Sequence, residues 1–486
     1  MKRIVYLAFF VLLMSQTGAA EEAVDFSTYF LDQTLRIDTF HGGDNQEEEI
    51  VLDKLYLQGA WAGNPKNLID ASGFGRYQVR LHDGASDRLI FCRGFDSYFG
   101  DFQATTLAAA GRRTFGESVL IPLPRHKAVL ILLARDSGRQ WRMLFKKELD
   151  PANVVANNQK VDPAVLVIPA RSSGSPHEKV DVAFIGEGYT AAQEEKFRRD
   201  LERLAGIFLS QEPYKSLADK FNIWGVFKAS AETGCDEPGY GSYKNTALEA
   251  SFDTFGLERY LLVEDNRRLR DVAAAAPYDA LVVMVNHARY GGGGLYNTYC
   301  VLSVDSAEHA YLLLHEFGHS FGGLADEYYT SAVAYENVNP IGVEPVEPNV
   351  TAMLATEGVK WQALLTPKIP LPTPWEKARF EELETPYQKK RQELNQKIAG
   401  ERKLGNPSVG LENELQALTE AHARDVERLF SKSRFRGKVG AFEGAGYTAR
   451  GLYRPMLDCL MFTRGTKPLC RVCASAMERV IRFYAQ

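Results

Sequence analysis

His315, Glu316 and His319 form the string His-Glu-Phe-Gly-His, within a stretch from Ala307 to Phe321 that has helical character. Residues four positions apart lie on one face of a helix, so both imidazoles can reach a single metal ion. Glu316 lies about 100° around the same helix, where it can stand beside that ion without ligating it. A carboxylate in this place can act as general base toward a water molecule that the metal activates. The string therefore predicts a catalytic zinc site, Zn²⁺ being the cofactor.

The residues that follow this helix predict the third metal ligand. The pair Gly322-Gly323 can adopt positive φ angles and end the helix. Such a turn brings the next residues back toward the ion, and Asp326 follows the pair by three positions. Asp326 would complete a set of two imidazoles and one carboxylate, with one position open for water. The alternatives are Glu327 or a glutamate farther along the chain, Glu336 or Glu344.

The segment from His315 to Tyr328 resembles the zinc signature of the bacterial IgA peptidase family, metallopeptidase family sixty-four. Two further segments resemble the same family, Phe184–Thr190 and Tyr453–Cys459. The resemblance covers about residues 175–486, and the residues before them look like the domain that precedes the peptidase domain in that family.

The family is similar to the metzincins, whose zinc string ends in a third histidine. Here Ala325 occupies that eleventh position of the string, and Asp326 follows it. The resemblance implies that Asp326 takes the place of the third histidine. It also implies a methionine under the zinc, for which Met456 is the first candidate and Met461 the second.

Two other features bear on catalysis. Tyr453 is a candidate donor of a hydrogen bond to the oxyanion that forms during attack on a carbonyl, or else a packed aromatic residue. The run Gly291–Gly294 precedes a candidate strand, Tyr299–Val304. In zincin-like peptidases the substrate pairs with an edge strand at this place, so the candidate strand is expected to line the cleft. A surface loop is the alternative reading.

Residues 1–20 have the order of a secretory signal peptide. Lys2 and Arg3 precede an apolar run from Ile4 to Met14, and small residues follow up to Ala20. The run is about half of the ~20 residues that a transmembrane helix needs. We therefore expect export to the periplasm or the extracellular space of a bacterium, without a transmembrane anchor.

The rest of the chain divides into two predicted domains. Residues 21–170 contain short alternating runs separated by turn signals, which favours an all-β sandwich. From 175 to 486 apolar strands alternate with helical patterns, which is typical of an α/β sheet covered by helices. We expect a multidomain chain in which the second domain is zincin-like, and metzincin-like in detail.

Residues 376–430 predict a helical hairpin inserted in the second domain. They are rich in Glu, Lys, Gln, Arg and Leu and are interrupted by Gly405-Asn406-Pro407. The charged faces are expected to be solvated. A role in substrate gating or partner binding is the alternative.

The six cysteines allow several arrangements. In an exported chain disulfides are permitted, and Cys459 with Cys470 or Cys473, or Cys235 with Cys300, are local candidates. Cys470-x-x-Cys473 is alternatively half of a structural zinc site or a redox pair. The spacing alone does not choose among these readings.

Composition narrows the choice of function. Apolar residues make up 45% and charged residues 24%, and the net charge is -5, so neither a nucleic-acid nor an anionic-membrane partner is expected. The expected function is a zinc endopeptidase acting on a protein or glycoprotein. The alternatives are a glycan- or protein-binding module with a vestigial zinc domain, and a zinc amidase acting on cell-wall peptides. The intact Glu316 argues against a vestigial site, because a non-catalytic metal site does not need that acid.

Overall fold

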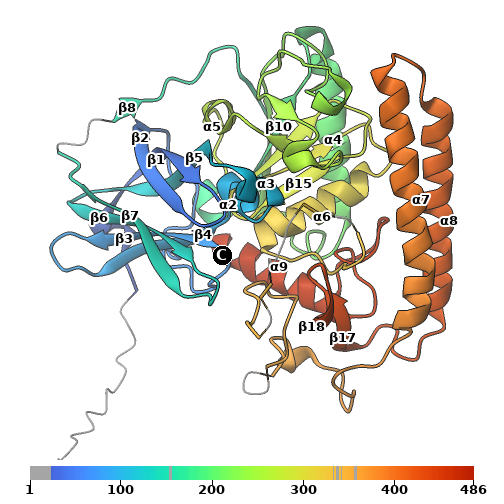
Figure 1. Cartoon of the computed structure of the whole chain (residues 1–486). Helices are drawn as coiled ribbons and strands as arrows, with labels where there is room; N and C mark the ends of the chain where they lie inside the picture. Colours follow the sequence, from blue (N-terminus) through green and yellow to red (C-terminus); the bar gives the residue numbers. More distant parts are fainter. Residues whose placement is uncertain are drawn as a thin grey trace, which may run out of the picture.

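The computed structural model describes residues 23–152, 156–331, 333–334, 339–340, 342–354 and 358–485. The predicted signal peptide and the alternative ligand Glu336 lie outside these residues. A β-rich N-terminal region lies beside an α/β region, and a long helical hairpin lies on the far side of the α/β region (Figure 1). The chain is therefore multidomain, as the change of sequence pattern between its two parts predicts.

Two four-stranded sheets make up the N-terminal region, with the orders β5-β1-β2-β8 and β4-β3-β6-β7. Leu130 and Leu132 of β6 point inward by the two-residue period of a strand, and they share one core with Leu35 and Ile37 of β1. The two sheets thus enclose a single apolar core. Their strands are β1 Phe30–Gly43, β2 Glu48–Leu57, β3 Tyr77–Asp83, β4 Leu89–Phe95, β5 Arg113–Pro124, β6 Ala128–Arg135, β7 Trp141–Leu149 and β8 Asn157–Asn158. Short helices join them at α1 Phe26–Tyr29, α2 Tyr98–Gln103 and α3 Thr106–Ala110.

A six-stranded sheet forms the centre of the α/β region, in the order β15-β16-β14-β10-β11-β9. Its four inner strands are parallel, and the two edge strands are antiparallel to their neighbours. β10 and β14 are buried along their whole length, which explains their continuous apolar sequences. The strands are β9 Leu166–Arg171, β10 Val180–Glu187, β11 Phe221–Phe227, β14 Ala280–Val285, β15 Gly292–Leu295 and β16 Tyr299–Ser303. A separate two-stranded sheet pairs β12 Ala250–Ser251 with β13 Leu262–Val263.

Helices cover both faces of this sheet. Val182 and Phe184 of β10 share a core with α4 (Glu194–Ser210) and α6 (His309–Gly322). Ala183 and Ile185 point to the other face and share a core with α5 (Asn266–Ala273). The α6 helix is therefore held against the sheet beside β15 and β16.

The boundary between the two regions differs from the predicted one. We expected the N-terminal domain to extend to residue 170, but β9 pairs with β11 as an edge of the six-stranded sheet. Leu166–Arg171 therefore belongs to the α/β region. The apolar alternation of this segment cannot show which of two sheets it joins, because pairing is decided by distant strands.

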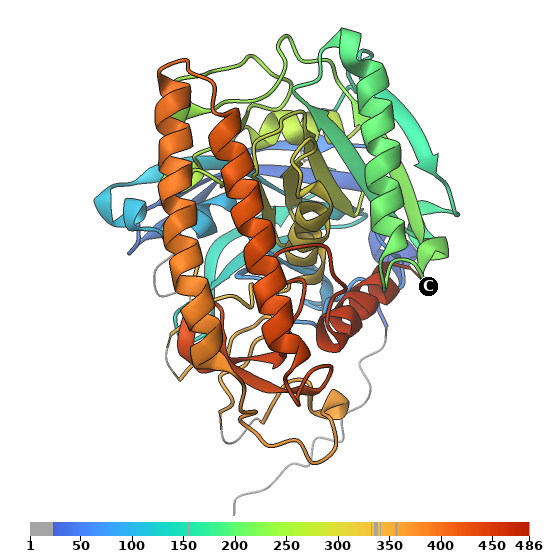
Figure 2. The ribbon, with the colours of Figure 1, turned by 90° about the vertical axis from the view of Figure 1, so that its right-hand side faces the viewer.

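The predicted charged insertion is a pair of helices, α7 (Lys377–Lys403) and α8 (Val409–Ser431), which run side by side in Figure 2. The turn between them contains Gly405 with a positive φ of 74°. The stack of Tyr387 on His422, with ring centroids 3.9 Å apart, joins the two helices. After the hairpin come the two-stranded sheet of β17 (Val439–Ala445) and β18 (Thr448–Met456), and then α9 (Arg471–Tyr484).

Hydrogen bonds join the N-terminal region to the segment after β15. The main-chain N–H of Asp96 donates to the carbonyl of Tyr296 at 2.8 Å, and the side-chain amide Nδ2 of Asn297 donates to the carbonyl of Gly94 at 2.7 Å. The two regions are thereby fixed beside one another near α6. Within the described part of the chain, no helix has both the length and the hydropathy needed to cross a bilayer.

Candidate metal centre and cleft

The helix α6 carries the predicted metal ligands on a buried element. Leu312, Leu313 and Phe317 are fully or almost fully buried against the sheet. The helix ends at Gly323, whose φ of 60° is left-handed and favours glycine. The amide of Gly323 donates to the carbonyl of His319 at 3.1 Å. This turn returns the chain toward the two histidines, as the glycine pair predicts.

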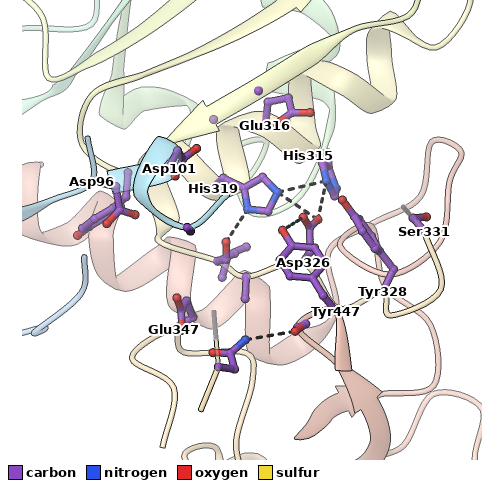
Figure 3. Close-up of a pocket in the computed structure, with 18 of the residues that line it drawn as sticks. Asp96, Asp101, His315, Glu316, His319, Asp326, Tyr328, Ser331, Glu347 and Tyr447 are labelled. Atoms are coloured by element: carbon purple, nitrogen blue, oxygen red, sulfur yellow. Dashed lines mark hydrogen bonds and ion pairs between the residues drawn. The ribbon is translucent and has the colours of Figure 1, made fainter. Parts of the chain in front are cut away.

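Three ligand atoms converge at this turn (Figure 3). The Nε2 atoms of His315 and His319 are 3.2 Å apart, and they lie 3.0 and 3.2 Å from Oδ1 of Asp326. Ligands bonded to a tetrahedral zinc at about 2.0–2.1 Å lie about 3.3 Å from one another. The separations therefore fit one metal ion. We call His315, His319 and Asp326 the His-Asp cluster.

Hydrogen bonds orient each member of the His-Asp cluster. Nδ1 of His315 contacts the carbonyl oxygen of Leu460 at 3.2 Å, and Nδ1 of His319 contacts that of Leu324 at 2.6 Å. A ring that donates from Nδ1 keeps the lone pair of Nε2 available for a metal. The Tyr447 hydroxyl donates to Oδ2 of Asp326 at 2.5 Å, which leaves Oδ1 facing the histidines.

The charge of Asp326 follows from its surroundings. Burial alone would favour the protonated acid, but the two imidazoles hold the pKa of Asp326 well below its usual range. Oδ1 has no hydrogen-bond partner other than its contacts with these rings among the residues that the structure describes. A buried anion with a free lone pair is a suitable ligand for a cation.

Glu316 lies beside the cluster and lines the same cleft (Figure 3). Burial raises the pKa of Glu316, although the two histidines oppose that rise. Oε1 of Glu316 lies close to Gly292, where an added Cβ would be only 3.0 Å away. Glycine at this position therefore lets the edge strand approach the acid.

The glycine run forms the edge strand itself. We expected Tyr299–Val304 to be the strand that lines the cleft, or the run to be a loop, but Gly292–Leu295 is β15 and occupies the edge of the sheet. Gly292, Gly293 and Gly294 all line the cleft, whereas β16 lies one position inward. A Cβ at Gly294 would lie 2.6 Å from the carbonyl oxygen of Glu316. Close packing of the strand on α6 thus explains the run, and glycine's poor strand propensity hides such a strand in the sequence.

The cleft has a volume of about 1360 Å³ and is bounded by three parts of the chain. The α/β region supplies its floor with the His-Asp cluster and Glu316. The other walls come from the N-terminal region, with Glu48, Arg76, Asp96 and Arg135, and from the hairpin, with Glu384, Tyr387, Gln388 and His422. One face of the charged hairpin therefore faces the cleft rather than bulk solvent.

Two predicted residues lie away from the cluster. Tyr453 in β18 bonds through its main chain to Thr351 and is not among the described residues that line the cleft. Met456 ends β18 opposite Val439. The sulfur of Met461, the second candidate, lies under the helix, 3.0 Å from where a Cβ on Gly318 would be.

Sequence reasoning missed Tyr447 and Tyr328. Both line the cleft, and Tyr447 contacts Asp326 across 121 positions of sequence. Tyr447 is a non-glycine residue with a positive φ of 64°, next to Gly446. The Gly446-Tyr447 turn was the only local signal, and it does not say what the ring would reach.

Two of the alternative ligands, Glu327 and Glu344, are engaged elsewhere. Glu327 points away from the His-Asp cluster and meets Asn349 and Cys473. Glu344 pairs with Lys360 at 3.4 Å and accepts from the amide of Ala352.

Two known protein families match the chain. The family described as IgA Peptidase M64 matches residues 168–481, and the family described as Peptidase M64 N-terminus matches residues 25–146. No curated protein matches the chain. The first match covers more than half of the chain and includes α6 and Asp326. The chain therefore belongs to the M64 family of IgA peptidases, which are metal-dependent peptidases.

Proposed function

We propose that this chain is an exported zinc endopeptidase that hydrolyses peptide bonds of protein or glycoprotein substrates, with Glu316 as general base. The observation that carries the proposal is the convergence of Nε2 of His315, Nε2 of His319 and Oδ1 of Asp326 within 3.2 Å of one another on the floor of the cleft. Two nitrogens and one carboxylate oxygen, with a position left toward the cleft, suit a catalytic zinc ion.

The donor set fits zinc for a further reason. The hydrogen bonds from Nδ1 of both histidines and from Tyr447 to Asp326 hold the ligand atoms in place before metal binds. A zinc ion held there would supply a Lewis acid that polarises a carbonyl group and makes water a stronger nucleophile near neutral pH.

Glu316 would carry out the proton transfers. Its carboxylate lines the cleft next to the metal ligands. Glu316 is not needed as a ligand, because Asp326 already provides the third one. It would accept the proton of the attacking water and then pass it to the nitrogen of the leaving amine.

The strand β15 offers a place for the substrate backbone. The amide of Gly292 donates to the carbonyl of Arg259, on the side of β15 away from β16. Because alternate residues of a strand present their backbone groups to the same side, Gly294 presents its own in that direction too. An extended peptide would add to β15 at Gly294, close to Glu316 and His319.

An endopeptidase, rather than an exopeptidase, fits the shape of the cleft. Its walls come from the N-terminal region, the α/β region and the hairpin. The cleft volume of about 1360 Å³ leaves room for several substrate residues. Export rests on the order of charged, apolar and small residues in 1–20.

The deciding experiment compares Glu316→Gln with the unchanged protein. We expect the variant to retain zinc and to lose about 10²–10⁴-fold in kcat on casein, because only the base is removed. The matched control is Glu195→Gln, whose side chain is 79% exposed on α4 and pairs with Arg198 of its own helix.

A panel of casein, mucin, immunoglobulin and peptidoglycan tests the substrate class. Release of new amino termini from a protein, abolished in Glu316→Gln, supports the proposal. Normal turnover by Glu316→Gln contradicts the mechanism, and cleavage of peptidoglycan alone would indicate an amidase.

A further inference from the structure

A second group of ligand-type side chains lies directly behind the His-Asp cluster. Glu327, next in sequence to Asp326, meets Cys459, Cys470 and Cys473, and their ligand atoms all lie within 4.8 Å of one another. Exposed fractions are 0% for Glu327 and Cys473, 1% for Cys459 and 5% for Cys470. We call these four residues the Cys-Glu cluster.

The distances within the Cys-Glu cluster match a tetrahedral zinc site. The sulfurs of Cys459 and Cys473 are 3.8 Å apart, and the sulfur of Cys473 lies 3.2 Å from Oε1 of Glu327. Thiolates bonded to zinc at about 2.3 Å lie about 3.8 Å from one another. The three thiols are free, so no disulfide accounts for their approach.

Main-chain amides donate to two of the sulfurs. The sulfur of Cys459 accepts from the amide of Cys470 at 3.3 Å, and that of Cys470 accepts from the amide of Cys473 at 3.5 Å. Cys470 is the N-cap of α9, a helix of 14 residues. Amide donors and a helix N-terminus both favour the thiolate form that ligates a metal.

Glu327 provides an independent sign that a cation belongs here. Oε1 accepts from the amide of Asn349 at 3.0 Å, but Oε2 has no hydrogen-bond partner among the residues that the structure describes. No ion pair to Glu327 is formed by the described part of the chain; the guanidinium of Arg454, whose charge acts on Glu327, donates to the carbonyls of Gly444 and Leu457. A fully buried carboxylate with an unpartnered oxygen needs either a proton or a cation in direct contact, and a metal ion would supply that cation.

We propose that Glu327, Cys459, Cys470 and Cys473 bind a second zinc ion in a closed structural site. Three thiolates and one carboxylate fill a tetrahedral shell, and thiolate ligands select zinc over harder divalent cations. The thiols release their protons to solvent as the metal binds. The proposal stands whether or not the His-Asp cluster is catalytic.

Such a site would position the catalytic floor. The loop that begins at Cys459 places the carbonyl of Leu460 against Nδ1 of His315 and the carbonyl of Met461 against the amide of Glu327, at 2.8 Å. The second metal would tie this loop, the segment after α6 and the start of α9 together. His315 and Asp326 would then be held from behind.

Metal analysis of the full chain, purified without chelator, tests the proposal. We expect two zinc ions per chain in the unchanged protein, one in His319→Ala, and one in Cys470→Ser/Cys473→Ser. Cys92→Ser is the matched control, because Cys92 is a buried thiol in β4, and it should keep both ions. A single zinc in the unchanged protein that is lost in His319→Ala would overturn the proposal, and so would peptide mapping that finds a disulfide among the three cysteines.

Cobalt substitution avoids reliance on variants that fail to fold. His319→Ala loaded with Co²⁺ should show the thiolate-to-cobalt charge-transfer absorption that imidazole and carboxylate ligands do not produce. Absence of this absorption in metal-loaded His319→Ala and in the cobalt-loaded unchanged protein would refute the second site. Loss of casein cleavage in His319→Ala, with the absorption retained, separates failure of this proposal from failure of the peptidase proposal.

Discussion

The His-Asp cluster and the Cys-Glu cluster meet at two adjacent residues, Asp326 and Glu327, and differ in ligand type, ligand number and access to the cleft. Asp326 turns toward the cleft and Glu327 turns toward α9, so one segment supplies a ligand to each. The first cluster has three side chains of the α6 region at the floor of an open cleft. The second has four side chains, all buried, drawn from three separate segments.

This difference distinguishes two uses of a metal. A site with three protein ligands and an approach from the cleft leaves a position for water and substrate, whereas four ligands close the shell. Imidazole and carboxylate suit an ion that must exchange a ligand, and thiolates suit one that stays bound. Under the two proposals, adjacent residues serve different metals: Asp326 ligates the catalytic zinc and Glu327 ligates the structural one.

The largest expected effect separates the clusters by activity. Asp326→Ala should lower kcat/KM by at least about 10³-fold, because the zinc supplies several kcal/mol of transition-state stabilisation. Elemental analysis should show loss of one metal ion, with the thermal unfolding midpoint little changed. Undiminished metal content would break the assignment of Asp326 to the open site.

The second effect separates the clusters by stability. Cys473→Ser should lower the free energy of unfolding by about 3–5 kcal/mol, since it leaves Glu327 buried without its counter charge. Denaturant unfolding measures this, and Cys92→Ser again serves as the control. If Asp326→Ala lowered the free energy of unfolding and Cys473→Ser did not, the structural role would belong to the His-Asp cluster instead.

In the N-terminal region, a protonated histidine rather than a metal ion supplies the positive charge beside two buried carboxylates. His41 lies between Glu48 and Glu117, at 3.2 and 2.8 Å. Burial disfavours its charged form, but the two carboxylates raise the pKa of His41 from 6.5 to about 9. Because the pKa of His41 is higher in the folded than in the unfolded chain, protonation of His41 stabilises the folded state. This stabilisation is complete below pH 6.5 and is lost as the pH rises through about 9.

The free energy of unfolding of the N-terminal region should therefore fall by up to about 3 kcal/mol as the pH rises from 6.5 to about 9. His41→Gln should remove the dependence, which can be followed by the pH variation of the unfolding midpoint. A metal in the Cys-Glu cluster would give a different dependence, with stability falling on acidification as the thiolates protonate. Equal pH profiles for His41→Gln and the unchanged protein would contradict the role of His41.

The smallest effect concerns the tyrosines. Tyr447→Phe should weaken zinc binding by about 10–100-fold, because the bond that orients Asp326 is lost. Tyr453→Phe should leave both zinc affinity and kcat unchanged, since Tyr453 lies outside the described lining of the cleft. Titration with a competing chelator measures both. A stronger effect of Tyr453→Phe would restore that residue as the oxyanion donor.

The His-Asp cluster was predictable because its members lie within twelve residues of one another. Helix periodicity alone places His315 and His319 on one face, and the left-handed Gly323 returns the chain to Asp326. The strands β10 and β14 were predictable in the same way, because their continuous apolar runs indicate buried strands. Local backbone geometry determines such features before the chain is packed.

The remaining features depended on residues far apart in the sequence. Spacing offered Cys459, Cys470 and Cys473 as disulfide, redox or zinc candidates, but only packing brought Glu327 to them across more than a hundred positions. Packing alone also brought Tyr447 to Asp326 and Met461 under α6. It likewise decided that β9 joins the six-stranded sheet and that the glycine run forms the edge of that sheet. The sequence by itself determined the helix that carries the first two ligands, His315 and His319, because a helix is a local structure. The tertiary structure decided what lies behind that helix, because burial joins segments that no local rule relates.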